Sequence, residues 1–140
     1  MNNYPIVIVD ADAIIASENA GDFHHQKTMK ILERLSVLHA QVLYPTTAIA
    51  EAATHMQRVL GDTERAYNTV MLMTKFETQV VDVGKQTLVE ALKFFSPKTS
   101  KKNTIFDCIV AAVARREKAD AIFSFDRFYK KNGFTLAEEL

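Results

Sequence analysis

The stretch from Asn103 to Phe128 constrains the fold of this chain more than any other part of the sequence. Its first part, residues 105–114, is apolar at every position except Asp107. A helix that is apolar all round is a buried helix, and an ionised carboxylate inside one needs a partner because burying it unpaired is very costly. The short apolar strand Ala121–Phe123 follows, and Asp126 lies three residues past its end. One helix and one strand therefore each supply a carboxylate.

Each of these two acids also has an ordinary structural explanation. Thr104 and Asp107 have the spacing of a capping box, in which the acid lies three residues after a Thr cap. Asp126, directly before Arg127, is equally typical of a turn. A functional interpretation therefore depends on whether further acids occupy matching places in the fold.

Length and composition predict an ordinary globular protein. We expect one domain spanning residues 1–140. Its 17 Lys and Arg balance its 17 Asp and Glu, so any basic surface for a polyanionic partner must be local. The single cysteine, Cys108, lies in the apolar helix and is typical of a core residue in a reducing compartment. The sequence has neither a signal-peptide core nor a run of about 20 apolar residues, so we expect a cytoplasmic protein with no membrane attachment.

Apolar strands alternate with helices along the chain. Residues 4–9 form a continuous β-branched run, which is typical of a central parallel strand covered on both faces. Further strands are predicted at residues 41–44, 78–83 and 121–123. Helices between the strands predict an α/β fold, with a parallel sheet and helices on both faces. In such sheets the ligand lies beyond the carboxyl ends of the strands.

Hydrophobic spacing also predicts which helix faces are buried. A helix over residues 63–76 should point Tyr67, Val70 and Met71 inward. A helix over residues 85–95 should bury the face formed by Leu88, Val89, Leu92 and Phe95. Residues 130–140 are expected to form a loop and a short tail.

Four acids are predicted to meet at one edge of this sheet. Asp10 ends the first strand, Glu51 lies early in the helix after the second, and Asp107 and Asp126 lie before and after the last. Clustered carboxylates repel one another and raise each other's pKa unless a cation joins them. All-oxygen ligands suit Mg²⁺ or Mn²⁺, which can polarise a phosphoryl oxygen and generate a hydroxide nucleophile. A phosphodiester is then the natural substrate.

Basic residues flank the last two acids. Lys101 and Lys102 precede the helix that carries Asp107, and Arg127 and Lys130 follow Asp126. These four cations are candidates for holding a nucleic-acid backbone. From charge alone, a solvated surface loop is the simpler explanation. The four histidines are assigned to surface or capping positions in preference to a catalytic or metal-binding role.

Four segments of the chain resemble the motifs of the PIN-domain nucleases, in the right order and over nearly the whole sequence. The segments are residues 7–12 (VIVDAD), 46–51 (TTAIAE), 107–112 (DCIVAA) and 124–128 (SFDRF). The resemblance implies a three-layer α/β/α sandwich with a central parallel sheet, and metal-dependent hydrolysis of RNA. It also implies Asp10, Glu51, Asp107 and Asp126 as ligands of the metal and the water, with Ser124 in support. A lone domain of this size is similar to the VapC-type toxins of toxin–antitoxin pairs, which implies an antitoxin partner and a homodimer.

Asp12 departs from the pattern of this family, which usually has Ser, Thr or Asn at that place. A fifth acid in a supporting position leaves the number of metal ions open. It also leaves an alternative, because a strand ending in Asp-x-Asp opens the haloacid-dehalogenase phosphatases, in which Asp10 would be the nucleophile and Asp12 the acid. In the haloacid-dehalogenase phosphatases, a Thr or Val normally occupies the place that Ile14 has here. The non-catalytic alternatives are a receiver-like or a degenerate PIN-like binding module, although none of the four PIN acids is missing.

Overall fold

The computed structural model describes residues 3–75 and 77–140, and within them four parallel strands form one sheet in the order β3-β2-β1-β4. The strands are β1 (Ile6–Val9), β2 (Gln41–Pro45), β3 (Val80–Val81) and β4 (Ala121–Phe123). Val7 pairs with Val42 on one side and with Ala121 on the other. The predicted parallel sheet is confirmed.

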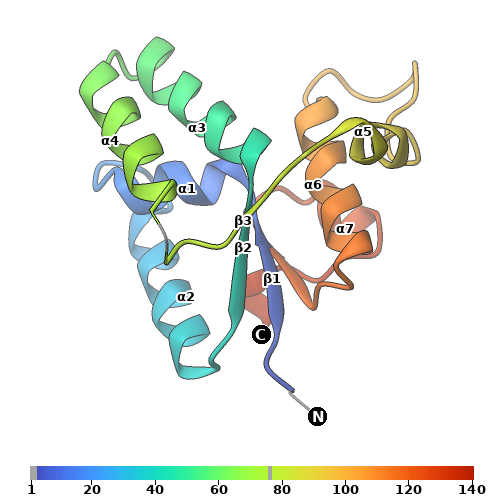
Figure 1. Ribbon diagram of the computed structural model, residues 1–140, viewed down its shortest axis with the longest axis horizontal. Helices are drawn as coiled ribbons and strands as arrows, with labels where there is room; N and C mark the ends of the chain where they lie inside the picture. The colour runs from blue at the N-terminus through green and yellow to red at the C-terminus, as the bar shows by residue number, and fades with distance from the viewer. Residues whose placement is uncertain (1–2, 76) are drawn as a thin grey trace.

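Helices cover both faces of the sheet. They are α1 (Ala11–Glu18), α2 (His25–Val37), α3 (Thr46–Arg58), α4 (Thr63–Met73), α5 (Lys85–Ala91), α6 (Ile105–Arg116), α7 (Phe128–Lys131) and the 3₁₀ helix η1 (Ala137–Glu139). Figure 1 shows α1 to α4 on one side of the sheet and α5 to α7 on the other. The three-layer α/β/α sandwich is therefore confirmed. Within the described residues, no helix is long and apolar enough to cross a membrane.

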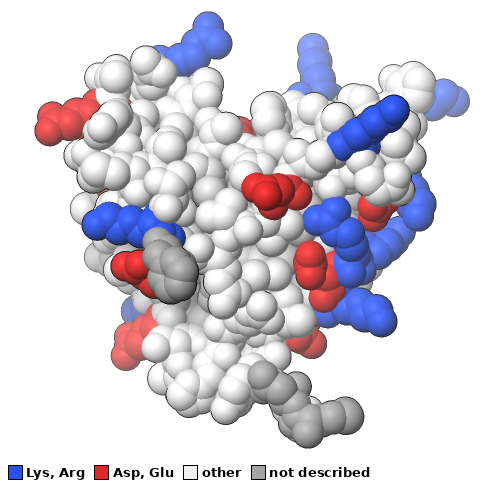
Figure 2. All heavy atoms as spheres, viewed as in Figure 1, with Lys and Arg blue, Asp and Glu red and all other residues white. Residues whose placement is uncertain are grey.

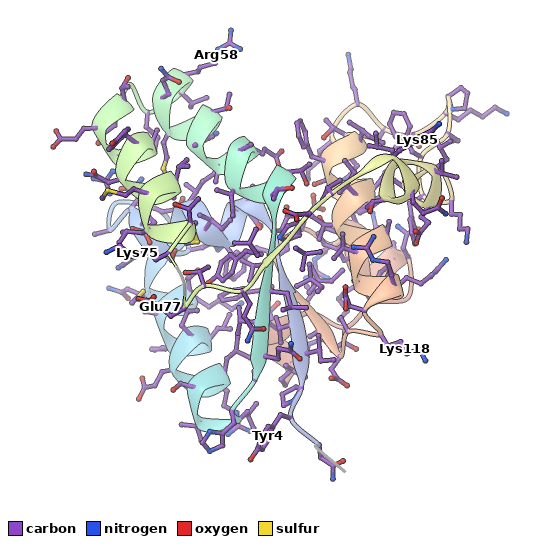
Figure 3. The ribbon with its side chains drawn as sticks, viewed as in Figure 1. Tyr4, Arg58, Lys75, Glu77, Lys85 and Lys118 are labelled. Carbon is purple, nitrogen blue, oxygen red and sulfur yellow. The ribbon has the colours of Figure 1, made fainter. Side chains whose placement is uncertain are left out.

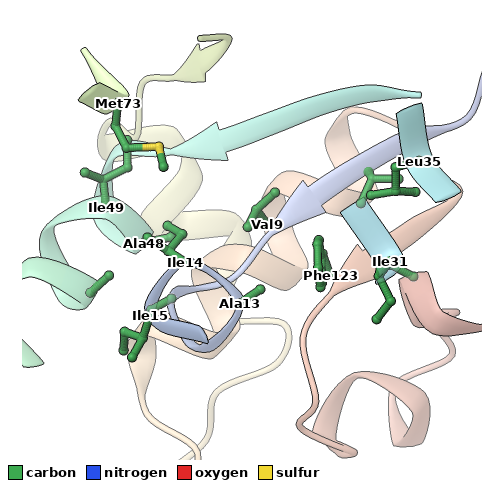
Figure 4. Close-up of a cluster of buried hydrophobic side chains, with 14 of the residues drawn as sticks. Val9, Ala13, Ile14, Ile15, Ile31, Leu35, Ala48, Ile49, Met73 and Phe123 are labelled. Carbon is green, nitrogen blue, oxygen red and sulfur yellow. The ribbon is translucent and has the colours of Figure 1, made fainter. Parts of the chain in front are cut away.

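The sheet separates two hydrophobic cores. Successive side chains of a strand point to opposite faces, so Val7 and Val9 lie in one core and Ile8 lies in the other. Figure 4 shows the first core, in which side chains of α1, α2 and α3 surround Val9 and Phe123. Burial on both faces explains why the strands are apolar at nearly every position.

The helix α6 begins with a capping box and is buried along most of its length. The amide of Phe106 donates to Oγ1 of Thr104 at 3.3 Å, and the amide of Thr104 donates to Oδ2 of Asp107 at 3.0 Å. Residues 108–114 are all buried. The buried helix and the capping interpretation of Asp107 are both confirmed.

The inward faces predicted for α4 and α5 are wrong. The helix α4 buries Ala66, Thr69 and Met73, while Tyr67, Val70 and Met71 are exposed. The helix α5 buries only Thr87 and Ala91, while Leu88, Val89, Leu92 and Phe95 are exposed. Small inward residues let a helix approach its neighbour closely. Here α5 lies against α6, and the guanidinium of Arg116 on α6 donates to Oγ1 of Thr87 at 2.6 Å. The predicted helix end at Phe76 lies outside the described residues.

The chain after β4 is more ordered than predicted. Residues 128–131 form α7, residues 137–139 form η1, and buried Leu136 makes a parallel bridge with Ile122 of β4. The predicted loop and tail at residues 130–140 is therefore wrong. This segment closes one edge of the sheet beside β4.

Candidate functional site

Five carboxylates line one cavity at the carboxyl edge of the sheet. The cavity has a volume of about 240 Å³, and its acidic lining residues are Asp10, Asp12, Glu51, Asp107 and Asp126. Asp10 directly follows β1, and Asp126 follows β4, which is paired with β1. Connections from β1 and to β4 run on opposite faces of the sheet, and such a switch point is where ligands bind in open α/β sheets. The structure brings the four predicted acids together, and Asp12 with them.

Asp10 is held rigidly at the start of α1. Its Oδ1 accepts the amide of Ala11 at 2.7 Å, as the N-cap of the helix. Its Oδ2 accepts the hydroxyl of Tyr129 at 2.6 Å, and both side chains are buried. The protein therefore fixes both oxygens of this carboxylate from opposite ends of the chain.

Ser124 links two of the acids. Its hydroxyl donates to Oδ2 of Asp12 at 3.0 Å and accepts the amide of Asp126 at 3.1 Å. The amide of Phe125 donates to the same oxygen of Asp12 at 2.8 Å. Asp12 thus secures the segment that leaves β4, while Oδ1 of Asp126 accepts the amide of Phe128 at the start of α7 at 2.9 Å.

Asn103 bridges the other pair of acids. Its Nδ2 lies 2.9 Å from Oδ2 of Asp126 and 3.4 Å from Oδ2 of Asp107. The same oxygen of Asp107 accepts the amide of Thr104 in the capping box. Asp107 therefore caps α6 and lines the acidic cavity at once, so its two explanations are compatible.

The cavity raises the pKa of its carboxyl groups. Burial is the main cause for Asp10, Asp12 and Asp107, whose pKa values all lie above the ordinary range. Burial, followed by the charges of Asp107 and Asp12, raises the pKa of Glu51 to about 7. In the part of the chain that the structure describes, none of the five acids forms a salt bridge. Within the described residues, the cavity therefore gathers carboxyl groups without an ion-pair partner for any of them.

This donor set fits a hard divalent cation such as Mg²⁺ or Mn²⁺. The available ligands are carboxylate oxygens, which those ions prefer, and neutralising them would relieve the mutual repulsion. In this structure, the carboxylates of Asp10, Asp12, Asp107 and Asp126 accept hydrogen bonds from N–H and O–H groups of the protein. Among residues 3–75 and 77–140, no group of three or more Asp, Glu, His or Cys is already arranged to hold an ion. The acids form a cavity suited to a cation rather than a finished coordination sphere.

The four predicted basic residues lie outside the acidic cavity. Lys101, Lys102, Arg127 and Lys130 are all exposed. Lys101 lines a separate cavity beside Asn103, and Lys130 forms a salt bridge of 3.5 Å with Glu139. Figure 2 shows Lys and Arg side chains gathered over the part of the surface formed by α5 and α6. None of the four cations lines the acidic cavity.

Three residues of the site were not predicted. Tyr129 and Asn103 hold the acids, and His55, which was assigned to the surface, lines the acidic cavity. Asn103 and His55 each lie four residues from an acid, Asp107 and Glu51, a spacing that could have indicated them. Nothing in the sequence around Tyr129 indicates its contact with Asp10.

The chain is similar to known proteins over nearly its whole length. A family model of the PIN domain matches residues 7–134. Among solved structures, VapC20 of Mycobacterium tuberculosis, a toxin that cleaves the sarcin–ricin loop, has a TM-score of 0.79 at 18% identity over 92% of this chain and 96% of that one. VapBC2 from Rickettsia felis, bound to a DNA fragment from its promoter, has a TM-score of 0.62 at 11% identity over 94% and 96%. These structures share the fold. No curated protein sequence is significantly similar.

Proposed function

Because this chain belongs to the PIN-domain family, we propose that it is a metal-dependent endoribonuclease that hydrolyses RNA phosphodiester bonds. The observation that carries the proposal is the single cavity lined by Asp10, Glu51, Asp107 and Asp126. The family match favours this function over the phosphatase and receiver alternatives.

In this proposal the four acids hold Mg²⁺ or Mn²⁺. The bound cation would polarise the scissile phosphate and lower the pKa of the attacking water. Tyr129 keeps Asp10 in place, and Ser124 and Asp12 position the segment that carries Asp126. Such supporting hydrogen bonds orient the carboxylates and stabilise their charged forms, in which they can hold a cation.

Exposed cations would hold the RNA strand outside the cavity. Lys101, Lys102, Arg127 and Lys130 lie on segments that lead into or out of the acidic site. Contacts of this kind fix the position of a nucleic-acid backbone without reading its sequence. Replacing one of them with Ala should weaken binding similarly for all RNA sequences.

The structural relatives support a role as the toxin of a toxin–antitoxin pair, and we propose that this toxin acts in the cytoplasm. They include a VapC toxin and a VapBC assembly. We propose an antitoxin partner and a homodimer, for which the exposed apolar faces of α4 and α5 offer surface. A short neighbouring gene whose product has a DNA-binding half would support the antitoxin partner. Light scattering that finds only monomer at every practical concentration would contradict the homodimer.

Cleavage assays test the catalytic proposal directly. Purified protein should cut a sarcin–ricin-loop fragment or a single-stranded RNA with Mg²⁺ or Mn²⁺, stop with EDTA and leave 5′-phosphate ends. Asp126→Asn should remove this activity, whereas Asp62→Asn should keep it, because Asp62 caps α4 and does not line the cavity. Undiminished cleavage in EDTA, or 2′,3′-cyclic phosphate ends, would contradict the proposed route.

A further inference from the structure

A second cavity adjoins the acidic one. It has a volume of about 440 Å³ and is lined mainly by one face of α3, with Phe106 of α6 as a further wall. Glu51 and His55 line both cavities, so the two share a wall. Figure 1 shows α3 and α6 rising on opposite sides beyond the end of the sheet, and Figure 2 shows the surface hollowed between them. A molecule whose phosphate lies at the acids can therefore extend into the second cavity.

Consecutive residues of α6 serve the two cavities. Asp107 supplies a carboxylate to the first, and Phe106 supplies an aromatic ring to the second. Phe106 is 37% exposed, although the following turns of the same helix are buried. Its backbone is fixed by the capping box, since its amide donates to Oγ1 of Thr104. The ring is therefore presented on a rigid element, which keeps the entropic cost of binding low.

The remaining lining has the chemistry of a nucleotide site. Val59 adds exposed apolar surface, and His55 adds a second ring. Arg58 supplies a cation, and Figure 3 shows it at the outer end of α3. The volume lies within the range of about 300–1,000 Å³ typical of ligand pockets. Among the described residues of this lining, Glu51 at the shared wall is the only acid.

We propose that this second cavity is a nucleobase subsite, in which the base next to the scissile phosphate stacks on Phe106. This inference rests on the proposed ribonuclease function, because a phosphodiester in the acidic cavity places its neighbouring base within reach. Unstacked bases of single-stranded RNA are commonly held on aromatic side chains, and Arg58 suits the following phosphate. The substrate is then RNA that is single-stranded at the cut, such as a loop.

A tryptophan reporter tests the stacking. The chain has no Trp, so Phe106→Trp introduces a single fluorophore. In the Asp126→Asn background with Mg²⁺ present, where cleavage should not occur, an oligoadenylate should quench its fluorescence, whereas an abasic oligomer of equal length and charge should not. Tyr67→Trp is the matched control, because Tyr67 is 70% exposed and lines neither cavity. Equal quenching of the Phe106→Trp fluorescence by the oligoadenylate and the abasic oligomer would overturn the subsite. Quenching that depends only on protein concentration would also overturn it, because the cavity would then be covered by a second copy of the protein.

A second variant separates stacking from simple apolar contact. Phe106→Leu keeps an apolar side chain and the capping box but removes the aromatic face. It should weaken oligoadenylate binding about tenfold, and cleavage should fall mainly through KM. If Phe106→Leu binds oligoadenylate as tightly as the parent, and the parent cleaves RNA, the subsite is refuted while the proposed ribonuclease function stands. Base-specific quenching in a protein that never cuts RNA would support the subsite and sink the proposed nuclease.

Discussion

The hydroxyl of Tyr129 donates to Oδ2 of Asp10 at 2.6 Å, and both side chains are shut off from solvent. Burial, together with the charge of Asp10, raises the pKa of Tyr129 well above its ordinary value, so the phenol remains a donor. Asp10, which follows β1, is thus positioned by Tyr129 of α7, the helix that follows β4.

Replacing Tyr129 with Phe should weaken metal binding. The change leaves Oδ2 of Asp10 without its donor, so the charged form of the carboxylate is less stabilised. We expect Mn²⁺ affinity to fall about 10- to 100-fold by titration calorimetry, and unfolding free energy to fall by about 1–3 kcal/mol. Thr69→Val, which removes a buried hydroxyl on α4, should leave Mn²⁺ affinity unchanged. Equal Mn²⁺ affinity in Tyr129→Phe and the parent would refute a positioning role.

Two substitutions at Asp107 separate its capping role from its charge. Asp107→Asn keeps an oxygen that can accept the amide of Thr104, so the cap should survive while RNA cleavage is lost. Without metal, this variant should be at least as stable as the parent, because repulsion in the cavity falls. Asp107→Ala should lose both activity and about 1 kcal/mol of stability. Denaturant unfolding without metal measures the difference, and undiminished RNA cleavage by Asp107→Asn would assign the residue to capping alone.

Metal binding should depend on pH through Glu51. Its pKa is raised from 4.5 to about 7, so between these values the folded protein holds a proton that the unfolded chain has lost. The contribution of this group to stability is therefore greatest below pH 4.5 and is lost as the pH rises to 7. Since a cation competes with the proton, Mn²⁺ affinity should rise as the pH rises through 7. Calorimetry of Glu51→Gln should show weaker binding and a flatter pH profile, and an unchanged profile would contradict the assignment.

Asp12→Ser distinguishes a nuclease from a phosphatase. In the nuclease, Asp12 serves as a hydrogen-bond acceptor for the hydroxyl of Ser124 and the amides of Ala13 and Phe125, so cleavage of RNA should stay within about tenfold of the parent. In a phosphatase it would be the general acid, whose loss typically costs about 10²–10⁴-fold. Both proteins should be assayed on RNA and on a small phosphomonoester. Phosphomonoester turnover that disappears in the variant, with no RNA cleavage by either protein, would establish the phosphatase.

The sequence predicted the sheet and the acids because both depend on local patterns. Apolar β-branched runs mark strands buried on both faces, and an acid within a few residues of the end of such a strand lies at its carboxyl edge. Asp10 and Asp126 could therefore be placed without knowing any contact of their side chains. The capping box at Thr104 and Asp107 was also visible, because its spacing is fixed within one turn.

The features that were predicted wrongly or missed depend on tertiary contacts. Leu88 and Leu92 have the spacing of a buried face, yet small Thr87 and Ala91 make the close contact with α6 instead. Hydrophobic spacing shows that a helix has an apolar face and does not show whether that face is covered by the same chain. Tyr129 was missed for a similar reason, since its partner Asp10 lies 119 residues away.

The pairing of β1 with β4 has a consequence for the order of folding. The amide of Ile6 donates to Oδ2 of Asp120, 114 residues later, and Asp126 and Tyr129 follow that contact. A nascent chain that has not yet reached these residues lacks both one wall of the cavity and the phenol that holds Asp10. Synthesis proceeds from the N-terminus, so the site is completed only after residues 126–129 have emerged. For the proposed toxin, this delay is an interval in which a freshly made molecule cannot yet cut RNA.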